Sequence, residues 1–207
     1  LSAANRGHSA DDAVQAAEIL TRYPIAWGIQ LMPGLPGEDW QSLLLTAVRA
    51  VALKPHMARI YPTLVLDGTA LAVEYSAGRY VPLTLEEGVR RAAFLKALLE
   101  RCGIKVIRTG LQPTDELSRG GLLMAGPYHP SFGELTESFI WLQVIIRALA
   151  EISPTEKIFL HCHPRDESKI RGQRNSNLQR LYEMTAGNAV VRADGKKQGR
   201  IDAVHCN

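Results

Sequence analysis

Apolar residues recur at helical spacing in several stretches of the first half of the chain. The stretches are residues 10–23, 39–53, 69–77 and 84–102. Ser9 precedes the first of them, with Asp12 three positions later, and Thr84 and Glu87 have the same spacing at the start of the last. This spacing is typical of side chains that cap the first amides of a helix. The pattern therefore predicts four helices, one of them short.

Short apolar runs lie between these helices and predict strands. The runs are residues 26–32, 57–61 and 104–108. The first ends at the prolines and glycines of residues 33–37, and the second ends at Pro62, which excludes regular structure there. Alternation of strands and helices implies a parallel sheet with right-handed crossovers. In barrels built this way, substrates sit at the loops that follow the strands.

The alternation weakens after Gly110. Residues 112–115 and 126–130 are loop-like, and no strand is predicted before the amphipathic stretch 132–150. A further strand is expected over residues 157–163, followed by a partly helical basic segment and by a terminal pair of strands at 189–192 and 200–204. We therefore predict two domains, at residues 1–109 and 110–207.

Composition places the chain among soluble globular proteins, since 46% of its 207 residues are hydrophobic and 22% are charged. It shows neither a signal-peptide pattern nor an apolar run of membrane-spanning length. The three cysteines, Cys102, Cys162 and Cys206, form no C-x-x-C pair, which argues against a disulfide framework or a self-contained zinc site. A cytoplasmic location is expected.

The formal net charge is +3, and most of the excess lies beyond residue 165. Such a segment could attract a polyanion, or it could be an ordinary solvated surface. Between residues 165 and 180 its cations are accompanied by Gln173, Asn175 and Asn177, but no aromatic residue occurs before Tyr182. This pattern suits contact with phosphates better than reading of bases.

The loop at residues 33–39 places two glycines beside Glu38 and Asp39. Backbone can approach a ligand closely at glycine, so a cofactor edge would fit there, and a turn before an acidic helix start is the alternative. Arg59 and Tyr61 alternate with Ile60; if Ile60 faces the helices, the other two point into the barrel. An inward arginine requires an anion, from a substrate or from Glu38.

Other loops carry weaker candidates. His8 could be an acid or base near neutral pH or an ordinary surface group. Tyr128 and His129, between prolines, could stack a base or only pack against a neighbour. His161 and His163 could join the terminal residues 205–206 at a metal if their strands were adjacent, but the spacing does not demand it and no metal site is predicted.

Four blocks of sequence together resemble the radical SAM domain of the Elongator catalytic subunit. They are Asn-Arg-Gly-His-Ser at 5–9, Met-Pro-Gly-Leu-Pro-Gly at 32–37, the segment at 59–71, and Ser-Ala-Gly-Arg-Tyr at 76–80. Their order and spacing also match, over about the first 110 residues. Segments 109–114 and 125–132 resemble shorter bacterial relatives in which a small extension replaces the acetyltransferase domain.

This resemblance implies an α/β fold, the C-terminal half of a partial TIM-like radical SAM barrel with a small α+β extension. It implies a role in contacting S-adenosylmethionine and substrate within an enzyme that modifies tRNA. The cofactor-binding residues would be Gln30, Met32, Gly34 and Tyr61. The substrate-binding residues would be Arg6, His8, Arg59, Tyr128 and His129.

The family binds a 4Fe-4S cluster through a C-x-x-x-C-x-x-C-type motif, which this sequence lacks. The resemblance therefore implies S-adenosylmethionine and a cluster in the complete parent, whereas this chain alone is expected to hold neither and to be inactive. No catalytic residue is assigned. The alternative function is a non-catalytic module that binds RNA through the basic extension.

The expected partners follow from the same interpretation. The missing N-terminal half of the barrel would cover the first strand, RNA is a possible partner, and no membrane is involved. Without that half, the edge of the first strand has unpaired backbone groups. Self-association through this edge, or distortion of the first residues, is therefore expected.

Overall fold

The computed structural model describes residue 4 and residues 6–118, 121–150, 157–194, 199 and 201–206. The chain divides into two compact units, Leu1–Gly133 and Glu134–Asn207. The sequence placed the domain change earlier, after residue 109. The first unit extends further because residues beyond 109 pair and pack with it, as described below. No helix among the described residues is long and apolar enough to cross a membrane.

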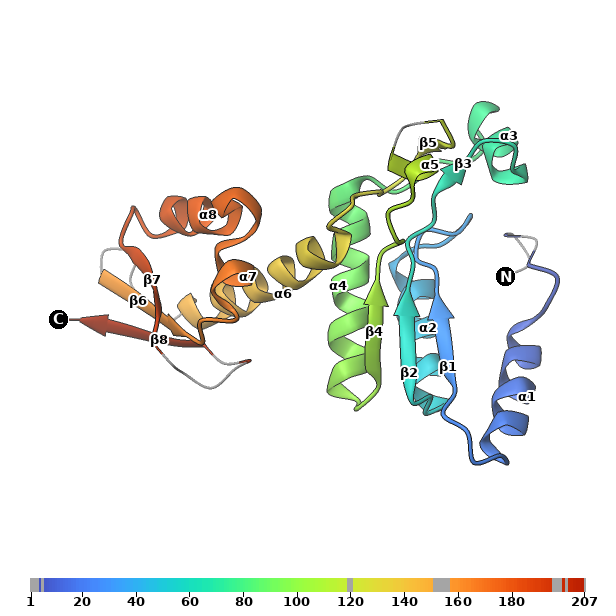
Figure 1. The fold of residues 1–207 in the computed structure, drawn as a ribbon, viewed down its shortest axis with the longest axis horizontal. Coiled ribbons are helices and arrows are strands. Elements are labelled where there is room, and N and C mark those ends of the chain that lie inside the picture. The colour runs from blue at the N-terminus through green and yellow to red at the C-terminus, as the bar shows by residue number, and fades with distance from the viewer. Residues whose placement is uncertain are drawn as a thin grey trace. The chain divides into compact units, whose positions relative to one another are not determined.

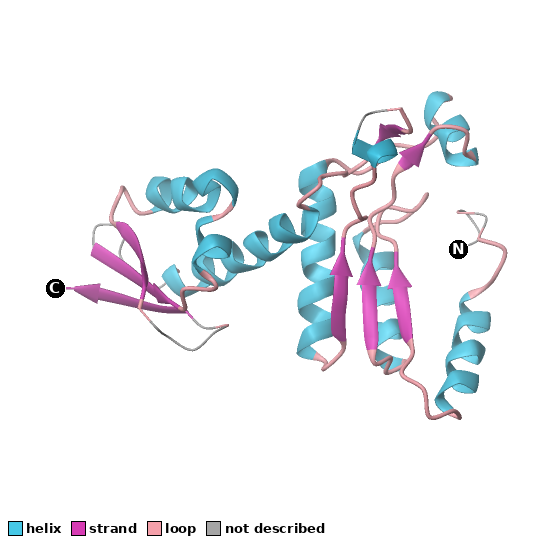
Figure 2. Ribbon diagram, in the orientation of Figure 1, coloured by secondary structure: helices cyan, strands magenta, loops and turns pink. Residues whose placement is uncertain are grey.

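A three-stranded parallel sheet forms the centre of the first unit, in the order β1-β2-β4 (Figure 1). Its strands are β1 (Gly28–Leu31), β2 (Met57–Ile60) and β4 (Lys105–Thr109). The helices are α1 (Ala10–Thr21), α2 (Trp40–Ala52), α3 (Ala70–Ser76) and α4 (Leu85–Arg101). Figure 2 shows the alternation of strands and helices that the sequence predicted.

Helices α2 and α4 cover one face of this sheet, as Figure 1 shows. Ala58 and Ile60 of β2 are fully buried, whereas Arg59 between them is exposed. This alternation is the period of a strand with one buried face, and it confirms the predicted direction of Ile60. The opposite face, with Gln30, Arg59 and Lys105 exposed, is called the open face below.

The helix starts follow the capping pattern of the sequence. Ser9 and Asp12 form a capping box at α1, and the Thr84 hydroxyl accepts a hydrogen bond of 3.2 Å from the Glu87 amide at α4. Asp39 and Ser42 form a further capping box at α2. Capping fixes where each helix begins after its strand, and so fixes the length of each connecting loop.

A small antiparallel pair of strands lies beyond the main sheet. It joins β3 (Val65–Leu66) to β5 (Leu123–Ala125), and the short helix α5 (Asp115–Ser118) precedes β5. The prediction that no strand occurs between residues 110 and 132 is therefore wrong. Only two residue pairs are in register, with an irregularity between them, which is too short for a period of two to appear in the sequence.

Two glycines allow the segment before α6 to pack against the first unit. A Cβ atom built on Gly110 would lie 2.7 Å from the Cβ of Phe132, and one built on Gly88 of α4 would lie 2.5 Å from the Cβ of Pro127. Gly110 also has a positive φ of 83°, a conformation that other residues rarely adopt. These contacts hold residues 126–132 against α4 and the end of β4.

The second unit is a mixed sheet with helices against one face. Its strands, in the order β7-β6-β8, are β7 (Ala189–Ala193), β6 (Lys157–Cys162) and β8 (Ile201–Cys206). Its helices are α6 (Phe132–Leu149), α7 (Glu167–Arg171) and α8 (Ser176–Met184), with a 3-10 turn η1 at Gln173–Asn175. The predicted pairing of the two terminal strands is wrong, because β6 lies between them.

The core of the second unit lies between this sheet and the helices. Ile145 of α6, Leu160 of β6 and Leu181 of α8 are fully buried there. Asn177 is one of the buried polar residues beside this core: its amide nitrogen donates to the Ser138 carbonyl oxygen at 2.9 Å, and the Ser138 hydroxyl donates to the Lys169 carbonyl oxygen at 2.9 Å. These hydrogen bonds join α6, α7 and α8, and satisfied buried polar groups fix one arrangement of helices.

We predict that Gly110→Ala destabilises the chain more than Gly103→Ala does. Both glycines have a positive φ, 83° and 80°, so both substitutions carry the backbone strain of about 1 kcal/mol. Only at Gly110 would the added methyl group clash with Phe132. This clash should lower the free energy of unfolding by about 1–3 kcal/mol more. Urea unfolding of the two variants measures the difference. Equal destabilisation would show that residues 126–132 do not pack as described.

Candidate functional site

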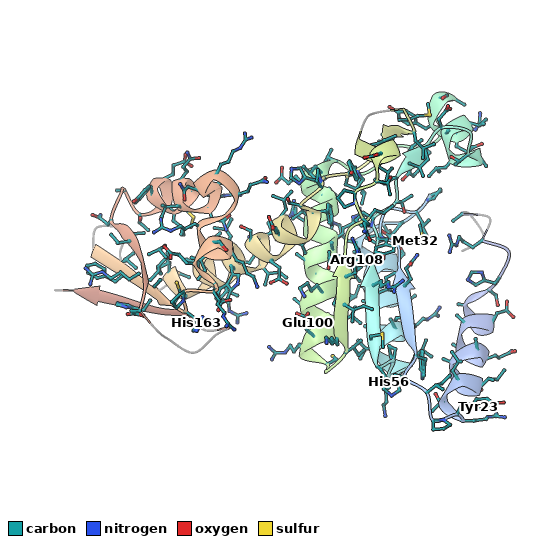
Figure 3. All side chains as sticks on the ribbon, in the orientation of Figure 1. Tyr23, Met32, His56, Glu100, Arg108 and His163 are labelled. Carbon is teal, nitrogen blue, oxygen red and sulfur yellow. The ribbon has the colours of Figure 1, made fainter. Side chains whose placement is uncertain are left out.

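The carboxyl ends of β1, β2 and β4 lie at one edge of the sheet, because the three strands are parallel. Met32 and Gly34 follow β1 directly, and Tyr61 follows β2. Figure 3 labels Met32 and Arg108 near this edge. The structure therefore brings several of the residues predicted from the sequence to one end of the sheet, on its open face or in the adjoining loops.

Three polar side chains form a row across the open face. Gln30 of β1 is in register with Arg59 of β2, and Arg59 is in register with Arg108 of β4. The register shifts by one residue after Ala58. This irregularity places Arg108 on the open face, where strict alternation would have placed Ile107 alone. Arg108 is not among the residues predicted from the sequence, because no local pattern of residues signals such a shift.

The two arginines of this row differ in their surroundings. Arg108 is half-buried, and its guanidinium donates to the Gln112 side-chain oxygen at 3.2 Å and to the Gly110 carbonyl oxygen at 3.4 Å. Arg59 is exposed and makes no side-chain hydrogen bond or ion pair with the described residues. Neither has a carboxylate partner within that part of the chain.

Glu38, the protein carboxylate that could have paired with Arg59, pairs instead with Arg91 of α4. The Arg91 Nη1 atom lies 2.9 Å from the Glu38 Oε1 atom, and the Arg91 Nε atom lies 3.1 Å from the Glu87 Oε1 atom. Arg91 is 8% exposed and also lies 5.5 Å from the centre of the Trp40 ring. A buried arginine is tolerated because both carboxylates neutralise it.

The same ion pair holds the loop after β1. The Gly34 amide donates to the Glu38 Oε1 atom at 2.7 Å, and the Tyr80 hydroxyl donates to the Gly34 carbonyl oxygen at 2.6 Å. Gly34 has a φ of 92°, and a Cβ atom there would lie 2.8 Å from Leu83. Both polar backbone groups of Gly34 are thus engaged inside the protein, and the glycine is required by the conformation of the loop.

Burial influences the ionisation of the groups around this loop. It raises the pKa of Glu38, although hydrogen bonds from Gly34 and Arg91 act in the opposite direction. It also raises the pKa of Tyr80, so this phenol remains a hydrogen-bond donor at neutral pH. A cavity of 160 Å³ borders the loop between residues 34–38 and 79–83.

Arg6 reaches the carboxyl end of β1, where its Nη1 atom lies 3.6 Å from the sulfur of Met32. His8 is exposed, and its Nδ1 atom lies 2.9 Å from the Arg6 carbonyl oxygen, so the ring is turned toward its own loop. Tyr61 is half-buried, and its amide donates to the Leu31 carbonyl oxygen at 2.9 Å, which continues the strand pairing into the loops.

Tyr128 and His129 lie in the loop after β5 and are half-buried. Pro127 anchors this loop against Gly88 of α4, and the His129 Nδ1 atom accepts a hydrogen bond of 3.1 Å from the Ser131 amide. The loop therefore has a fixed conformation within the first unit. It is a different loop from those that follow the three parallel strands.

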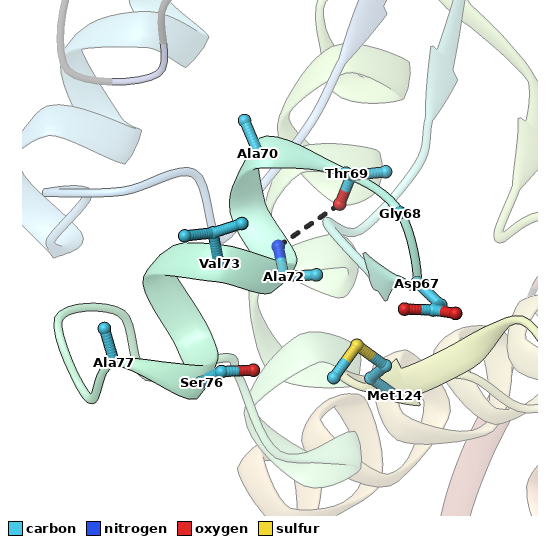
Figure 4. Close-up of a pocket in the computed structure, with 9 residues that line it drawn as sticks. All are labelled: Asp67, Gly68, Thr69, Ala70, Ala72, Val73, Ser76, Ala77 and Met124. Atoms are coloured by element: carbon cyan, nitrogen blue, oxygen red, sulfur yellow. Dashed lines mark hydrogen bonds between the residues drawn. The ribbon is translucent and has the colours of Figure 1, made fainter.

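A second hollow, of 650 Å³, lies between α3 and β5 (Figure 4). It is lined by Met124, by the polar residues Asp67, Thr69 and Ser76, and by the small residues Gly68, Ala70, Ala72, Val73 and Ala77. Asp67 and Gly68 form the turn between β3 and α3, where Gly68 has a φ of 74°. Thr69 caps α3 through a 3.2 Å hydrogen bond from the Ala72 amide.

No group of three or more metal-ligating side chains occurs among the described residues. Cys102 is exposed at the end of α4, and Cys162 is buried in the core of the second unit, where burial raises the pKa of its thiol. His161 of β6 contacts Asp194, which directly follows β7, and residue 205 pairs with Ile158 rather than with His161. The thiols in the described residues do not fit a 4Fe-4S cluster.

Comparisons with known proteins find similarity over part of the chain. Residues 55–140 match the Radical_SAM C-terminal domain. The chain is 30% identical over 99 residues to a tRNA uridine(34) acetyltransferase of Methanocaldococcus jannaschii, covering 46% of this chain and 18% of that protein. It is 33% identical over 98 residues to a protein of the same name from Dehalococcoides mccartyi, covering 45% of this chain and 21% of that protein.

A solved structure shares the fold. It is the archaeal Methanocaldococcus infernus Elp3 with its N-terminus deleted, at a TM-score of 0.60 and 24% identity, covering 70% of this chain and 34% of that one. The chain thus spans only a part of each relative. The resemblance seen in the sequence motifs is confirmed as a similarity: residues 55–140 resemble the Radical_SAM C-terminal domain, and the chain is similar to part of proteins related to the Elongator catalytic subunit.

Proposed function

We propose that this chain forms the cofactor- and substrate-contacting side of a radical SAM enzyme that modifies tRNA. The open face of the β1-β2-β4 sheet carries this proposal. Among the described residues, α2 and α4 cover one face, and the exposed polar residues Gln30 and Arg59 lie on the other, beside the loops at the carboxyl ends of the strands. That is where enzymes with this strand arrangement bind their ligands.

S-adenosylmethionine would be held by side chains at this end of the sheet. The Gln30 amide can both donate and accept hydrogen bonds, and the half-buried Met32 and Tyr61 supply apolar surface. The sequence suggested that Gly34 binds the cofactor. Its amide and carbonyl groups are already hydrogen-bonded to Glu38 and Tyr80, so they would not bind the cofactor directly. Its role is to shape the loop that lies against the cofactor.

The one-electron reduction that cleaves S-adenosylmethionine requires a 4Fe-4S cluster bound by thiolates. The thiols in the described residues do not fit such a cluster, so another part of the complete enzyme would bind it. The proposed partner is therefore an N-terminal part of the barrel, docked beside β1, which is an edge strand of the sheet. In its absence, self-association through β1 remains our expectation.

The proposed substrate is RNA, supported by the names of the relatives as tRNA uridine(34) acetyltransferases. Arg6 and Arg59 would contact its anionic groups, and His8 would lie beside Arg6. Tyr128 and His129 occupy a rigid loop and would contact unpaired bases. The resemblance to bacterial forms without an acetyltransferase domain, and a cytoplasmic location, belong to the same proposal.

The function is tested by joining the chain to an N-terminal region that carries cluster-binding cysteines and reconstituting iron and sulfide without oxygen. We predict that the joined protein releases 5'-deoxyadenosine from S-adenosylmethionine. Gln30→Ala should weaken the use of S-adenosylmethionine roughly tenfold, as loss of one hydrogen bond would, whereas Gln41→Ala on the exposed surface of α2 should not. Absence of product despite an intact cluster would contradict the proposal.

The rigidity of the loop after β1 is testable in the chain as it stands. We predict that Tyr80→Phe lowers the free energy of unfolding by about 1 kcal/mol, because the Gly34 carbonyl loses its donor. It should also speed hydrogen exchange at the Gly34 amide. Tyr75→Phe is the matched control, since the Tyr75 hydroxyl has no hydrogen bond in the described residues. An equal response of both variants would mean that Tyr80 does not hold the loop.

RNA binding through the second unit, without catalysis, is the alternative function. One observation favours it: Arg165, Arg174 and Arg180 are exposed and form no ion pair in the described residues, whereas Arg171 is paired with Glu167 at 2.8 Å. Unpaired exposed cations are the ones available to phosphates. Three further cations counted in the basic segment, Lys196, Lys197 and Arg200, lie outside the described residues.

We predict that Arg174→Gln and Arg180→Gln each weaken RNA binding to a similar extent for all sequences. Each should reduce the slope of log affinity against log salt by about 1. Arg171→Gln should change this slope less, because the charge of Arg171 is already neutralised by Glu167. Fluorescence anisotropy with labelled RNA at several salt concentrations measures the slopes. Binding that is absent or insensitive to salt would remove this alternative.

A further inference from the structure

We propose that Arg59 and Arg108, together with Gln30, form an oxyanion-binding site on the open face. The ligand class is a phosphate or a carboxylate. The three residues come from three neighbouring strands and are in register with one another. They provide two guanidinium groups and one amide, which are the side chains best suited to hydrogen-bond a planar or tetrahedral oxyanion.

The register irregularity is the structural origin of this row. Before it, Ala58 pairs with Val106; after it, Arg59 pairs with Arg108, so one residue of β4 is passed over. Irregularities of this kind redirect a side chain and are common beside functional sites. Here the effect is to place a second arginine beside the first on the same face of the sheet.

The charges in this row lack a protein counter-ion. Neighbouring strands lie only about 4.8 Å apart, so the two guanidinium groups raise one another's electrostatic energy unless an anion lies with them. The described residues supply no carboxylate to either arginine. Arg91, by contrast, is buried between Glu38 and Glu87. Arg108 is half-buried, and its hydrogen bonds in the described residues go to uncharged acceptors, Gln112 and Gly110.

The site is also partly organised in advance. The Gln112 side chain and the Gly110 carbonyl oxygen hold the Arg108 guanidinium from the loop that follows β4. Arg6, which contacts Met32 at the end of β1, brings a third cation toward the same edge. A fixed guanidinium loses less freedom when it binds an anion, and this favours binding.

This inference deepens the proposed function and rests on it only for the identity of the molecule that carries the anion. A phosphate would belong to a nucleic acid backbone, and a carboxylate would belong to an amino-acid-like ligand. Binding of the anion itself requires neither a cluster nor S-adenosylmethionine. The site can therefore be measured in the 207-residue chain.

The experiment is a titration of the ¹⁵N-labelled chain with sodium phosphate and, separately, with sodium acetate at constant ionic strength. The arginine Nε–H signals are followed by NMR. We expect two of these signals to shift saturably as the anion is added. One should be absent from the spectrum of Arg59→Gln, and the other from the spectrum of Arg108→Gln. Tighter binding of phosphate would identify a phosphate ligand, and tighter binding of acetate would identify a carboxylate.

Either Arg59→Gln or Arg108→Gln should raise the dissociation constant of the bound anion roughly tenfold. Arg108→Lys should be intermediate, because it keeps the charge without the forked donors. Arg49→Gln is the matched control, since Arg49 is an exposed arginine of α2 without an ion pair in the described residues. Backbone amide spectra verify that each variant is folded.

The inference is overturned if no signal of the folded chain saturates, or if Arg49→Gln weakens binding as much as Arg59→Gln and Arg108→Gln do. Loss of 5'-deoxyadenosine formation with anion binding intact would count against the proposed function alone. Anion binding that is absent while 5'-deoxyadenosine still forms would count against this site alone. The two proposals can therefore fail separately.

Discussion

One-sided burial of the parallel sheet is the constraint on which the first unit depends. Parallel strands usually have both faces covered, yet α2 and α4 pack against one face only, where Ala58 and Ile60 are buried. The other face therefore combines exposed Gln30 and Arg59 with the edge where all carboxyl ends meet. Access for a ligand is a direct consequence of this uneven coverage.

The buried ion pair between Arg91 and Glu38 connects that coverage to the loop after β1. Arg91 belongs to α4, on the covered side, and Glu38 accepts both its guanidinium and the Gly34 amide. An ion pair in such surroundings contributes little net stability, because both charges have left water. Its effect is on geometry: it ties the position of the loop to the position of the helix.

The sequence predicted those elements whose signals are local. Capping residues such as Ser9 and Thr84 located the helices, and alternation about Ile60 gave the direction of Arg59. Predictions from the sequence were wrong or incomplete where segments distant in the chain contact each other. The short strand β5, the central place of β6 and the partner of Glu38 all depend on contacts between residues far apart in the chain. Arg108 was missed because one irregular pairing reverses its direction.

The contact between Gly88 and Pro127 constrains how this protein can vary. Glycine within a helix costs about 1 kcal/mol relative to alanine, so α4 bears a permanent penalty at this position. A larger residue would collide with the proline ring, whose shape cannot adjust. A larger residue at position 88 would therefore require a compensating substitution of Pro127, so helix α4 and the loop that carries Tyr128 are coupled in sequence.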